Sequence, residues 1–343
     1  MIQAMDSGKW ILITGGTGFI GFALVRRLIS QGHKVRVITR SLEFDKDFEQ
    51  YLSGTPGSYI EVLAGDIRKT ASIRDAFKDV DVVIHSAAML NTIAPFKDFR
   101  EANVTSTRNI CELCLEFKVS RLVYVSTCDV FGLPQKDTVF SESSPYRPWS
   151  EPYADTKIEA SQVVKDFRQR GLDYTIIYPG WVYGPGDKAF MPSILEQLRS
   201  GIMPIWDGGK YKIGMVYIDD IVDSFIRVLN KEESLNEDFL ILDDNPRMNM
   251  EDICKYLAAL YKIKFRILHI PYWLAFVIAW TSQTFVKMKL FKTPIMSTTD
   301  AKSMGLTFRY STEKARRLLG WSVKEDLESG LKKWKSWYMN SDL

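Results

Sequence analysis

Residues 10–21 are Trp-Ile-Leu-Ile-Thr-Gly-Gly-Thr-Gly-Phe-Ile-Gly. A short apolar run, typical of a buried strand, leads here into a turn in which Gly15, Gly18 and Gly21 recur at every third position. The first glycine permits a tight turn, the second lets the backbone approach a pyrophosphate, and the third lets the next helix pack closely. Apolar residues within 23–28 continue with helical spacing. Strand, turn and helix together predict a dinucleotide-binding site at the helix N-terminus.

The composition is that of an ordinary globular protein. The 343 residues are 46% hydrophobic and 25% charged, with a formal net charge of +3 and no long run of basic residues. This length can hold one large α/β unit or two smaller ones. The small net charge argues against nucleic acid as a partner. We predict no metal site, because the three histidines lie far apart and no closely spaced Cys/His quartet is present.

Cys111 and Cys114 form a Cys-x-x-Cys pair. Such a pair can be a redox centre, but apolar residues recur with helical spacing through 109–117, which favours two small residues in a buried helix face. Nothing near the start of the chain resembles a signal peptide, so we expect a reducing, cytoplasmic location.

Apolar runs rich in β-forming residues recur through the first half of the chain, mostly with helical patterns between them. They are 9–14, 34–39, 59–64, 81–85, 121–126 and 173–178. This alternation predicts an α/β fold with a doubly wound, Rossmann-type parallel sheet that binds ligands beyond the carboxyl ends of its strands. We predict a dinucleotide-binding Rossmann domain at 1–180. Residues 181–343 would form a smaller C-terminal α/β lobe, mainly for substrate binding, with some segments returning to the sheet.

The segment 267–290 is unusually rich in apolar and aromatic residues. It is interrupted by Pro271, Ser282, Gln283 and Lys287, and its strongest part is shorter than the ~20 apolar residues that a membrane span needs. Three interpretations stay open: a membrane span, a surface helix in peripheral contact with a membrane or a wide apolar ligand, and a buried or lid helix.

Tyr153 and Lys157 lie four residues apart in a segment with helical character, and so share one helix face. A phenol titrates near pH 10, so its use as a base near neutrality requires its pKa to fall by about 3 units, or roughly 4 kcal/mol. A neighbouring ammonium supplies part of that change. Ser126 and Thr127 end a β-type run, where a hydroxyl can orient a substrate oxygen. The two point to opposite sides of an extended strand, so one of them serves. The alternative is an ordinary surface Tyr and Lys.

These residues belong to a series of motifs that runs in order through nearly the whole chain. The others are Gly65-Asp-Ile67, His85-Ser-Ala-Ala88, Asn103 with Thr107 and Asn109, Val125-Ser-Thr-Cys-Asp-Val-Phe-Gly132 and Tyr178-Pro-Gly-Trp-Val-Tyr-Gly-Pro-Gly-Asp187. Together they resemble the extended short-chain dehydrogenase/reductases of the NAD(P)-dependent epimerase/dehydratase superfamily. The resemblance implies Tyr153 as the acid/base, Lys157 as its activator and ribose contact, and Thr127 as the orienting hydroxyl. Thr127 is preferred to Ser126 because it lies five residues before Gly132, as in the family motif.

The resemblance also implies a set of contacts to NAD(H) or NADP(H). They are Gly15, Thr17, Gly18, Phe19, Ile20, Gly21, Asp66, Ile67, Ala87, Ala88, Tyr153, Lys157, Pro179 and Val182. In this set Asp66 and Ile67 would contact adenine, Ala87 and Ala88 would line the dinucleotide, and Pro179 and Val182 would bracket the nicotinamide. Each also has a purely structural alternative: a turn cap, small packing residues, or a strand end.

The end of the second predicted strand bears on the choice of cofactor. NAD-preferring sites carry an Asp or Glu about 20 residues beyond the glycine turn. This chain has Thr39-Arg40-Ser41 there. The guanidinium of Arg40 and the missing acid favour the 2′-phosphate of NADP, whereas Glu43 or Asp45 could still reach a ribose. We predict NADP, with NAD as the alternative.

The C-terminal part carries the resemblance furthest toward a substrate. Its motifs at 270–285, 293–296, 310–321 and 327–334 are most similar to the 3β-hydroxysteroid dehydrogenase-like branch. That branch implies hydride transfer between nicotinamide and a secondary alcohol or ketone of an apolar sterol, steroid or terpenoid. The family also implies a homodimer.

Nucleotide-sugar epimerases, dehydratases and reductases are the alternative, because they share these motifs. Dehydratases carry an Asp-Glu pair after the catalytic threonine, where this chain has Cys128-Asp129. Lys210 and Lys212 stand where sugar-nucleotide enzymes often place an arginine for the diphosphate. A non-catalytic NADP-binding sensor is a third hypothesis. The pair 219–220, Asp-Asp, precedes an apolar helical pattern and is interpreted as a helix N-cap rather than a metal site.

Overall fold

The computed structural model describes residues 10–90, 94–135, 137–206, 209–288, 301 and 305–341. A seven-stranded sheet lies at its centre, with strand order β11-β7-β5-β4-β1-β2-β3 and every neighbouring pair parallel. The strands are β1 (Trp10–Thr14), β2 (Lys34–Thr39), β3 (Ile60–Ala64), β4 (Val80–His85), β5 (Arg121–Val125), β7 (Tyr174–Pro179) and β11 (Glu237–Ile241). From β1 the chain adds β2 and β3 on one side, and it then crosses over to add β4 on the other side of β1. Sheets of this kind bind ligands at the crossover point between β1 and β4. The predicted α/β fold with a Rossmann-type parallel sheet is confirmed.

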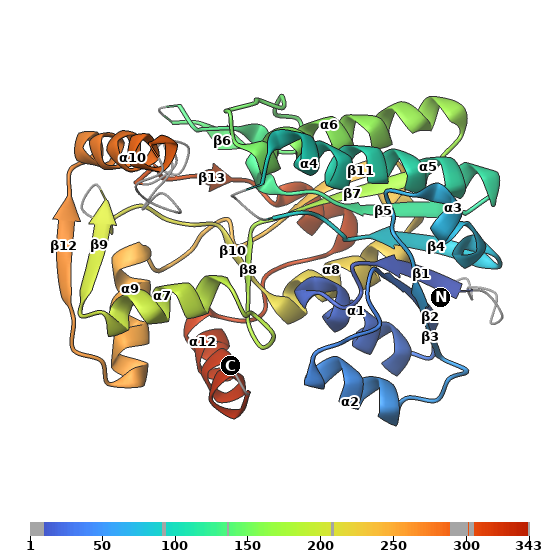
Figure 1. Cartoon of the computed structure of the whole chain (residues 1–343), viewed down its shortest axis with the longest axis horizontal. Coiled ribbons are helices and arrows are strands. Elements are labelled where there is room, and N and C mark those ends of the chain that lie inside the picture. Colours follow the sequence, from blue (N-terminus) through green and yellow to red (C-terminus); the bar gives the residue numbers. More distant parts are fainter. Residues whose placement is uncertain are drawn as a thin grey trace.

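Helices cover both faces of this sheet (Figure 1). They include α1 (Phe19–Ser30), α2 (Lys46–Gly54), α3 (Thr70–Ile73), α4 (Phe96–Phe99), α5 (Ser106–Glu116), α6 (Pro152–Phe167) and α8 (Ile218–Leu229). Neighbouring strand residues face opposite layers: Ile11 and Ile13 belong to the apolar core under α1 and α8, whereas Leu12 belongs to the core under α5 and α6. Burial on both faces explains why these strands are nearly continuous apolar runs.

The remaining elements form a second region beside the sheet. Its strands and helices are β8 (Trp181–Tyr183), β9 (Ile202–Trp206), β10 (Met215–Tyr217), β12 (Arg266–Ile270), β13 (Arg309–Tyr310), α7 (Phe190–Arg199), α9 (Met250–Tyr261), α10 (Tyr272–Lys287) and α12 (Leu327–Asn340). Parallel pairs form between β8 and β10, β9 and β12, and β13 and β6 (Val139–Phe140). The strand β11 enters the central sheet from this half of the chain. A domain division at residue 180 stays a prediction.

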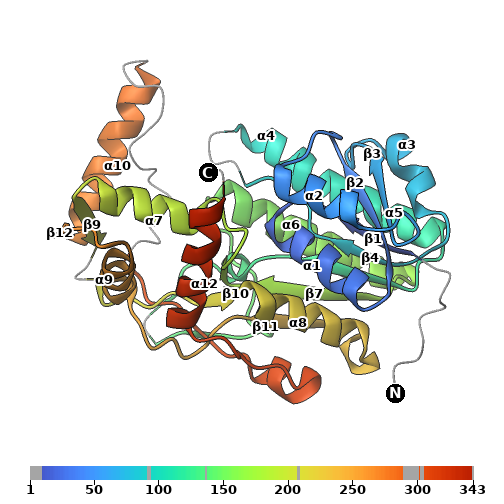
Figure 2. The same cartoon turned by 90° about the horizontal axis from the view of Figure 1, so that it is seen from below.

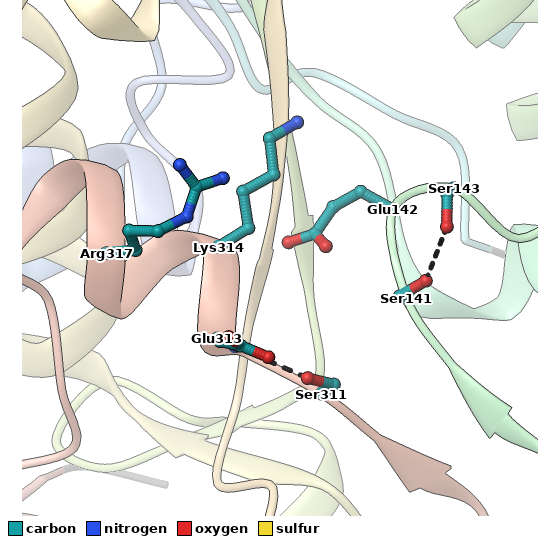
Figure 3. Close-up of a pocket in the computed structure, with 7 residues that line it drawn as sticks. All are labelled: Ser141, Glu142, Ser143, Ser311, Glu313, Lys314 and Arg317. Atoms are coloured by element: carbon teal, nitrogen blue, oxygen red, sulfur yellow. Dashed lines mark hydrogen bonds between the residues drawn. The ribbon is translucent and has the colours of Figure 1, made fainter.

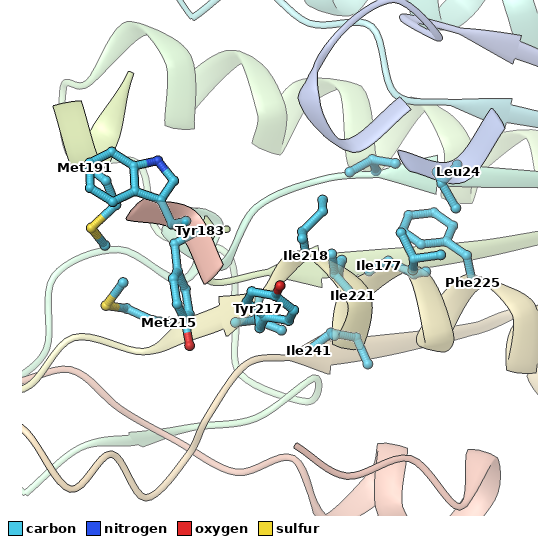
Figure 4. Close-up of a cluster of buried hydrophobic side chains, with 14 of the residues drawn as sticks. Leu24, Ile177, Tyr183, Met191, Met215, Tyr217, Ile218, Ile221, Phe225 and Ile241 are labelled. Carbon is cyan, nitrogen blue, oxygen red and sulfur yellow. The ribbon is translucent and has the colours of Figure 1, made fainter. Parts of the chain in front are cut away.

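One apolar core continues from the sheet into this second region. In Figure 4, Leu24 of α1 and Phe225 of α8 lie in the same cluster as Tyr183, Met191 and Met215. The same buried cluster extends to α9 and α12. Because the core is shared, the C-terminal segments are held against the carboxyl edge of the sheet by apolar packing.

The predicted apolar segment at 267–290 divides into two elements. Residues up to Ile270 belong to β12, so a helix beginning at 267 is wrong at its start, and α10 begins at Tyr272. Pro271 separates the two elements and lacks the N–H that a continuing ladder would need. Residues 289–290 lie outside the described part, as does the motif at 293–296. Within the described residues, no helix combines the length and hydropathy of a membrane span.

Candidate active site

The glycine turn links β1 to α1. Gly15 has a φ of +72°, and the amide of Gly18 donates to its carbonyl oxygen at 3.0 Å. A Cβ on Gly21 would collide with that oxygen, and a Cβ on Gly15 would lie 2.8 Å from the amide nitrogen of Ala87. Gly18 caps α1 without any side-chain hydrogen bond. The helix N-terminus is thus an uncovered set of N–H groups, which fits a dinucleotide pyrophosphate.

A buried histidine ties the ends of β1 and β4 together beside this turn. His85 lies 2.6 Å from Thr14 Oγ1 through Nδ1 and 3.0 Å from Thr107 Oγ1 through Nε2. Thr107 donates its own proton to the carbonyl of Asn103 at 2.6 Å, so Thr107 accepts from Nε2–H and Thr14 donates to Nδ1. Burial lowers the pKa of His85 to about 3. The neutral ring is therefore a fixed structural link, and Thr14 also accepts from the Ala87 amide at 3.3 Å.

Tyr153 and Lys157 lie in the first turns of α6, as predicted. Glu151 caps this helix by accepting from the amide of Ala154 at 2.5 Å, and proline occupies its first position. The Lys157 ammonium reaches down to the sheet and donates to the Val125 carbonyl at 2.6 Å. Burial lowers the pKa of Lys157 to about 7. Its charge is thus held in an apolar place that favours any added anion or hydroxyl acceptor.

The two hydroxyls after β5 separate as expected for an extended chain. Ser126 Oγ turns toward α6 and lies 2.8 Å from Ser161 Oγ in the buried interior. Thr127 turns the other way, and its hydroxyl lies beside the phenol of Tyr153. Thr127 and Tyr153 are therefore brought together, and Ser126 is not part of their group.

The carboxyl groups of Asp129 and Glu151 stand beside Thr127 and Tyr153. Neither was predicted as a site residue from the sequence. Thr127 Oγ1 donates to Asp129 Oδ2 at 2.9 Å, and the Asp129 amide donates back to Thr127 Oγ1 at 3.2 Å. Burial raises the pKa of Asp129 and that of Glu151. The pKa of Tyr153 is raised most by burial and further by the Asp129 carboxylate. The spacing of Asp129 two residues beyond Thr127 is the signal that could have revealed it.

Asn103 connects the loop after β4 to the helix that carries Tyr153. Its amide donates to Thr156 Oγ1 at 3.0 Å, and its oxygen accepts from the Met89 amide at 2.7 Å. Thr156 lies between Tyr153 and Lys157 on α6. Asn103 therefore helps to fix the start of α6 relative to the sheet.

The other predicted cofactor contacts follow the strand ends along one edge of the sheet. Thr17 lies in the glycine turn, Phe19 and Ile20 begin α1, Arg40 follows β2, Asp66 and Ile67 follow β3, Ala87 and Ala88 follow β4, and Pro179 ends β7 shortly before Val182 in β8. Carboxyl ends of parallel strands share an edge, so all of these residues lie at the edge that carries Thr127. The structure thus brings the predicted set to one side of the sheet.

Asp66 and Asp45 make ion pairs within the chain. The Asp66 carboxylate accepts from the Arg68 guanidinium at 2.9 Å and 2.7 Å, and this hydrogen bonding lowers the pKa of Asp66 to about 2. Asp45 caps α2 and pairs with Lys188 at 2.7 Å. The Asp45 carboxylate, an alternative ribose contact, is therefore already paired with Lys188, whereas Arg40 is exposed after β2.

Other features noted in the sequence lie outside this group. Cys111 and Cys114 are fully buried in α5, and burial raises the pKa of both thiols. The interpretation of 219–220 as an N-cap is wrong: Tyr217 is the cap of α8, and Asp220 accepts from the amides of Lys324 and Glu325 at 3.1 Å. Among the described residues, no group of three or more His, Cys, Asp or Glu side chains is arranged to hold a metal.

A polar pocket of about 400 Å³ lies apart from the predicted site (Figure 3). It is lined by Ser141, Glu142, Ser143, Ser311, Glu313, Lys314 and Arg317. Lys314 is already paired with Glu237 at 2.6 Å, and the Glu142 carboxylate faces the same space. None of the predicted site residues lines this pocket.

Comparison with known proteins identifies the family of this chain. The model of the NAD dependent epimerase/dehydratase family matches residues 11–241, well over half of the chain. The chain belongs to this family. The match confirms the relationship to the extended short-chain dehydrogenase/reductases. It covers all seven strands of the central sheet within the described residues apart from the first residue of β1.

Curated family members of similar length have reductase and dehydrogenase names. A 4-hydroxy-2-methyl-3-oxo-4-farnesyl-3,4-dihydroquinoline-1-oxide ketoreductase of Stigmatella aurantiaca is 24% identical over 93% of both chains. A 2-alkyl-3-oxoalkanoate reductase of Stenotrophomonas maltophilia is 27% identical over 95% of this chain and 98% of the relative. A decarboxylating sterol-4-alpha-carboxylate 3-dehydrogenase of Candida albicans is 25% identical over 98% and 99%. These relatives confirm the prediction of a dehydrogenase/reductase enzyme of the extended short-chain type.

Solved structures of the family share the fold. A dTDP-glucose 4,6-dehydratase of Streptomyces venezuelae, solved with NAD bound, has a TM-score of 0.78 and 23% identity over 97% of both chains. At this identity the likeness concerns the fold alone. The family is NAD-dependent by description, so a nicotinamide dinucleotide is the cofactor class; the choice of NADP stays a prediction.

Proposed function

We propose that this protein transfers a hydride between NADP(H) and a secondary alcohol or ketone of an apolar, sterol-, steroid- or terpenoid-like substrate. The observation that carries the proposal is the grouping of Thr127, Tyr153 and Lys157 at the sheet edge that also holds the glycine turn. A phenol, an orienting hydroxyl and an ammonium are the groups that carbonyl reduction and alcohol oxidation require. The nicotinamide, when bound, supplies or accepts the hydride.

In reduction, Tyr153 would give its proton to the substrate oxygen while Thr127 holds that oxygen by a hydrogen bond. Burial and the Asp129 carboxylate, which raise the pKa of Tyr153, keep the phenol protonated and ready as an acid. In oxidation the same phenol must first lose its proton, and the nearby Lys157 ammonium stabilises the phenolate. Lys157 would also hold a ribose hydroxyl. The Lys157 and Thr127 side chains are held by hydrogen bonds to Val125 and Asp129.

The preference for NADP rests on the end of β2. Arg40 is exposed there, while Asp45 is paired with Lys188 at 2.7 Å. A guanidinium can bind a 2′-phosphate through two hydrogen bonds. Titration of NADPH and NADH against the protein tests this: tighter binding of NADPH supports it, and weakening of NADPH alone in Arg40→Ala assigns the residue. Equal or tighter binding of NADH contradicts it.

The apolar substrate class is supported by the relatives that act, by name, on a farnesylated quinoline oxide, an alkylated oxoalkanoate and a sterol carboxylate. Against a nucleotide-sugar dehydratase stands Cys128 in place of the first acid of the dehydratase pair. Lys210, considered for a diphosphate, is exposed and binds phosphate only as a point charge. Homodimer formation and peripheral membrane contact also stay predictions.

The experiment is a side-by-side screen of steroid alcohols, their ketones and nucleotide sugars, followed by nicotinamide absorbance with both cofactors. Because a nucleotide-sugar epimerase regenerates its nicotinamide, product analysis by chromatography accompanies the absorbance assay. Turnover of steroid substrates supports the proposal. Turnover of nucleotide sugars alone, or cofactor binding without any turnover, favours one of the two alternatives.

A further inference from the structure

An ion pair joins the second region to the sheet half of the molecule. Lys188 Nζ lies 2.7 Å from Asp45 Oδ2, and the two residues are 143 positions apart in the chain. Lys188 stands just before α7, and Asp45 caps α2. Figures 1 and 2 both place α7 in the second region and α2 beside α1. We call this ion pair the Asp45–Lys188 clasp.

The two partners of the clasp flank the predicted dinucleotide path. That path runs from the end of β2, where Arg40 is exposed, to the start of α1 at Phe19. Asp45 belongs to the connection that follows Arg40 and borders the ribose end of the path. Lys188 closely follows Gly186, where an added Cβ would lie 3.0 Å from the Phe19 ring. The turn that carries Lys188 therefore borders the pyrophosphate end, and the clasp spans the path between them.

Each partner projects from a backbone that its own element fixes. The buried carboxylate of Asp187 accepts from the amides of residues 189–191, each at 2.9 Å. Trp334 of α12 donates to the Asp187 carbonyl at 3.1 Å. On the other side, Asp45 Oδ1 accepts from the Phe48 amide at 3.0 Å and leaves Oδ2 for the lysine. The clasp can therefore open by separation of two side chains, without unfolding of either turn.

The clasp is weak enough to open repeatedly. The side chains of Lys188 and Asp45 are 38% and 46% exposed. An ion pair at this exposure contributes little free energy, because water and salt screen its charges. A dehydrogenase/reductase exchanges its dinucleotide after each turnover, and such release steps often limit the rate. A weak closure over the path would slow this exchange without blocking it.

We propose that the Asp45–Lys188 clasp is a gate that slows both entry and release of the nicotinamide dinucleotide. Because the gate does not depend on the 2′-phosphate, it should act on NADPH and NADH alike. Its loss should raise the association and dissociation rates by the same factor and leave the dissociation constant nearly unchanged. The inference needs only the cofactor class of the family. It holds whichever substrate is turned over and whichever dinucleotide is preferred.

The experiment measures both rates by stopped flow on the full chain, without substrate. Association is followed by quenching of protein fluorescence on mixing with NADPH or, in a second series, with NADH. Release is followed by loss of energy transfer from protein tryptophan when excess NADP⁺ or NAD⁺ displaces the reduced form. Asp45→Asn removes the charge and keeps an oxygen to cap α2, and Lys188→Met keeps the length of the side chain. Each variant should raise both rates roughly two- to fivefold, the range that an exposed ion pair supplies.

The double variant distinguishes a gate from two independent residues. Asp45→Asn combined with Lys188→Met should be no faster than either single variant, since either change breaks the same pair. The difference from the unaltered chain should shrink in about 1 M salt, which screens the pair. The matched control is Glu112→Gln with Arg170→Met, which removes another exposed 2.7 Å ion pair. The control should keep the rates of the unaltered chain.

Unchanged rates in the single variants overturn the gate, as do rate increases that multiply in the double variant. Weakening of NADPH alone in Lys188→Met, with tightening in Asp45→Asn, assigns the lysine to the 2′-phosphate and also overturns it. Equal acceleration in the control variant does the same. Circular dichroism melting confirms that each variant is folded. Because either single variant breaks the pair, the other one decides the question if one is unfolded.

Discussion

The ammonium of Lys157 donates a 2.6 Å hydrogen bond to the carbonyl oxygen of Val125, the last residue of β5. This contact ties α6 to the strand whose next residues are Ser126 and Thr127. It therefore sets the distance between the proposed acid/base on α6 and the proposed orienting hydroxyl. The ammonium also lies 4.2 Å from the ring centre of Tyr124, which gives it a second favourable contact. Burial still dominates and lowers the pKa of Lys157 to about 7.

The lowered pKa of Lys157 predicts how stability changes with pH. Between about pH 7 and the ordinary lysine pKa near 10.4, the unfolded chain holds a proton at this residue that the folded chain has lost. This residue therefore makes the folded state more stable as pH rises through that window. In Lys157→Met this contribution disappears. We subtract the free energy of unfolding of the unaltered chain from that of the variant at each pH, both measured by urea titration. This difference should be highest near pH 7 and fall toward pH 10.

Lys165 provides the control on the same helix. Its pKa is raised, because the attraction of the Asp238 carboxylate, 2.6 Å away, outweighs burial. The stabilisation from this pair is complete below the unfolded lysine pKa and is lost only above it. Lys165→Met should therefore destabilise the chain by a nearly constant amount from pH 7 to about 9. The same slope in both variants would contradict the assignment to Lys157.

Tyr153→Phe tests the proposed acid/base. Loss of the phenolic hydroxyl should lower kcat by roughly 10²–10⁴-fold, the usual contribution of a positioned proton donor. The dissociation constant of NADPH should change little, because the ring and the Lys157 ammonium remain. Tyr59→Phe, at a partly exposed tyrosine outside the site, is the control and should keep full activity. Unchanged turnover in Tyr153→Phe would remove the proposed mechanism.

Asp129→Asn tests the carboxyl group beside Tyr153 to which the sequence motifs gave no role. The Asp129 carboxylate helps to raise the pKa of Tyr153, so the neutral amide should lower that pKa. In alcohol oxidation the phenol must be deprotonated, and the acidic limb of the kcat/KM profile should therefore move to lower pH, by about one unit. A merely structural role for Asp129 would lower the rate at all pH values and leave the limb in place.

Glu142→Gln is the matched control for this shift. Glu142 is an acid whose pKa is raised by burial, like that of Asp129, but it lines the separate polar pocket. Its removal should leave the profile unmoved. Movement of the limb to higher pH in Asp129→Asn would show that the carboxylate acts on Tyr153 with the opposite sign.

The strands of the sheet were predictable because burial on both faces makes them continuous apolar runs, as in β1 and β2. The strand β11 gave a weaker signal, since it begins with Glu237 and Asp238, whose charges are matched by lysines distant in sequence. The site was predictable where spacing alone carries the chemistry, as in Tyr153 and Lys157. The role of Asp129 was not, because its raised pKa depends on burial that only the folded chain creates.

A substitution at Gly21 tests whether the glycine turn needs the close backbone approach seen in the structure. A Cβ at Gly21 would collide with the Gly15 carbonyl oxygen, so Gly21→Ala must open the turn or move the start of α1. We expect a loss of about 1–3 kcal/mol in the free energy of unfolding, the usual cost of overpacking. Binding of NADPH, followed by quenching of protein fluorescence, should be abolished. Gly57→Ala is the control, since no atom lies within 4 Å of its added Cβ, and it should bind NADPH normally. Normal NADPH binding by Gly21→Ala would mean that the dinucleotide does not use this turn.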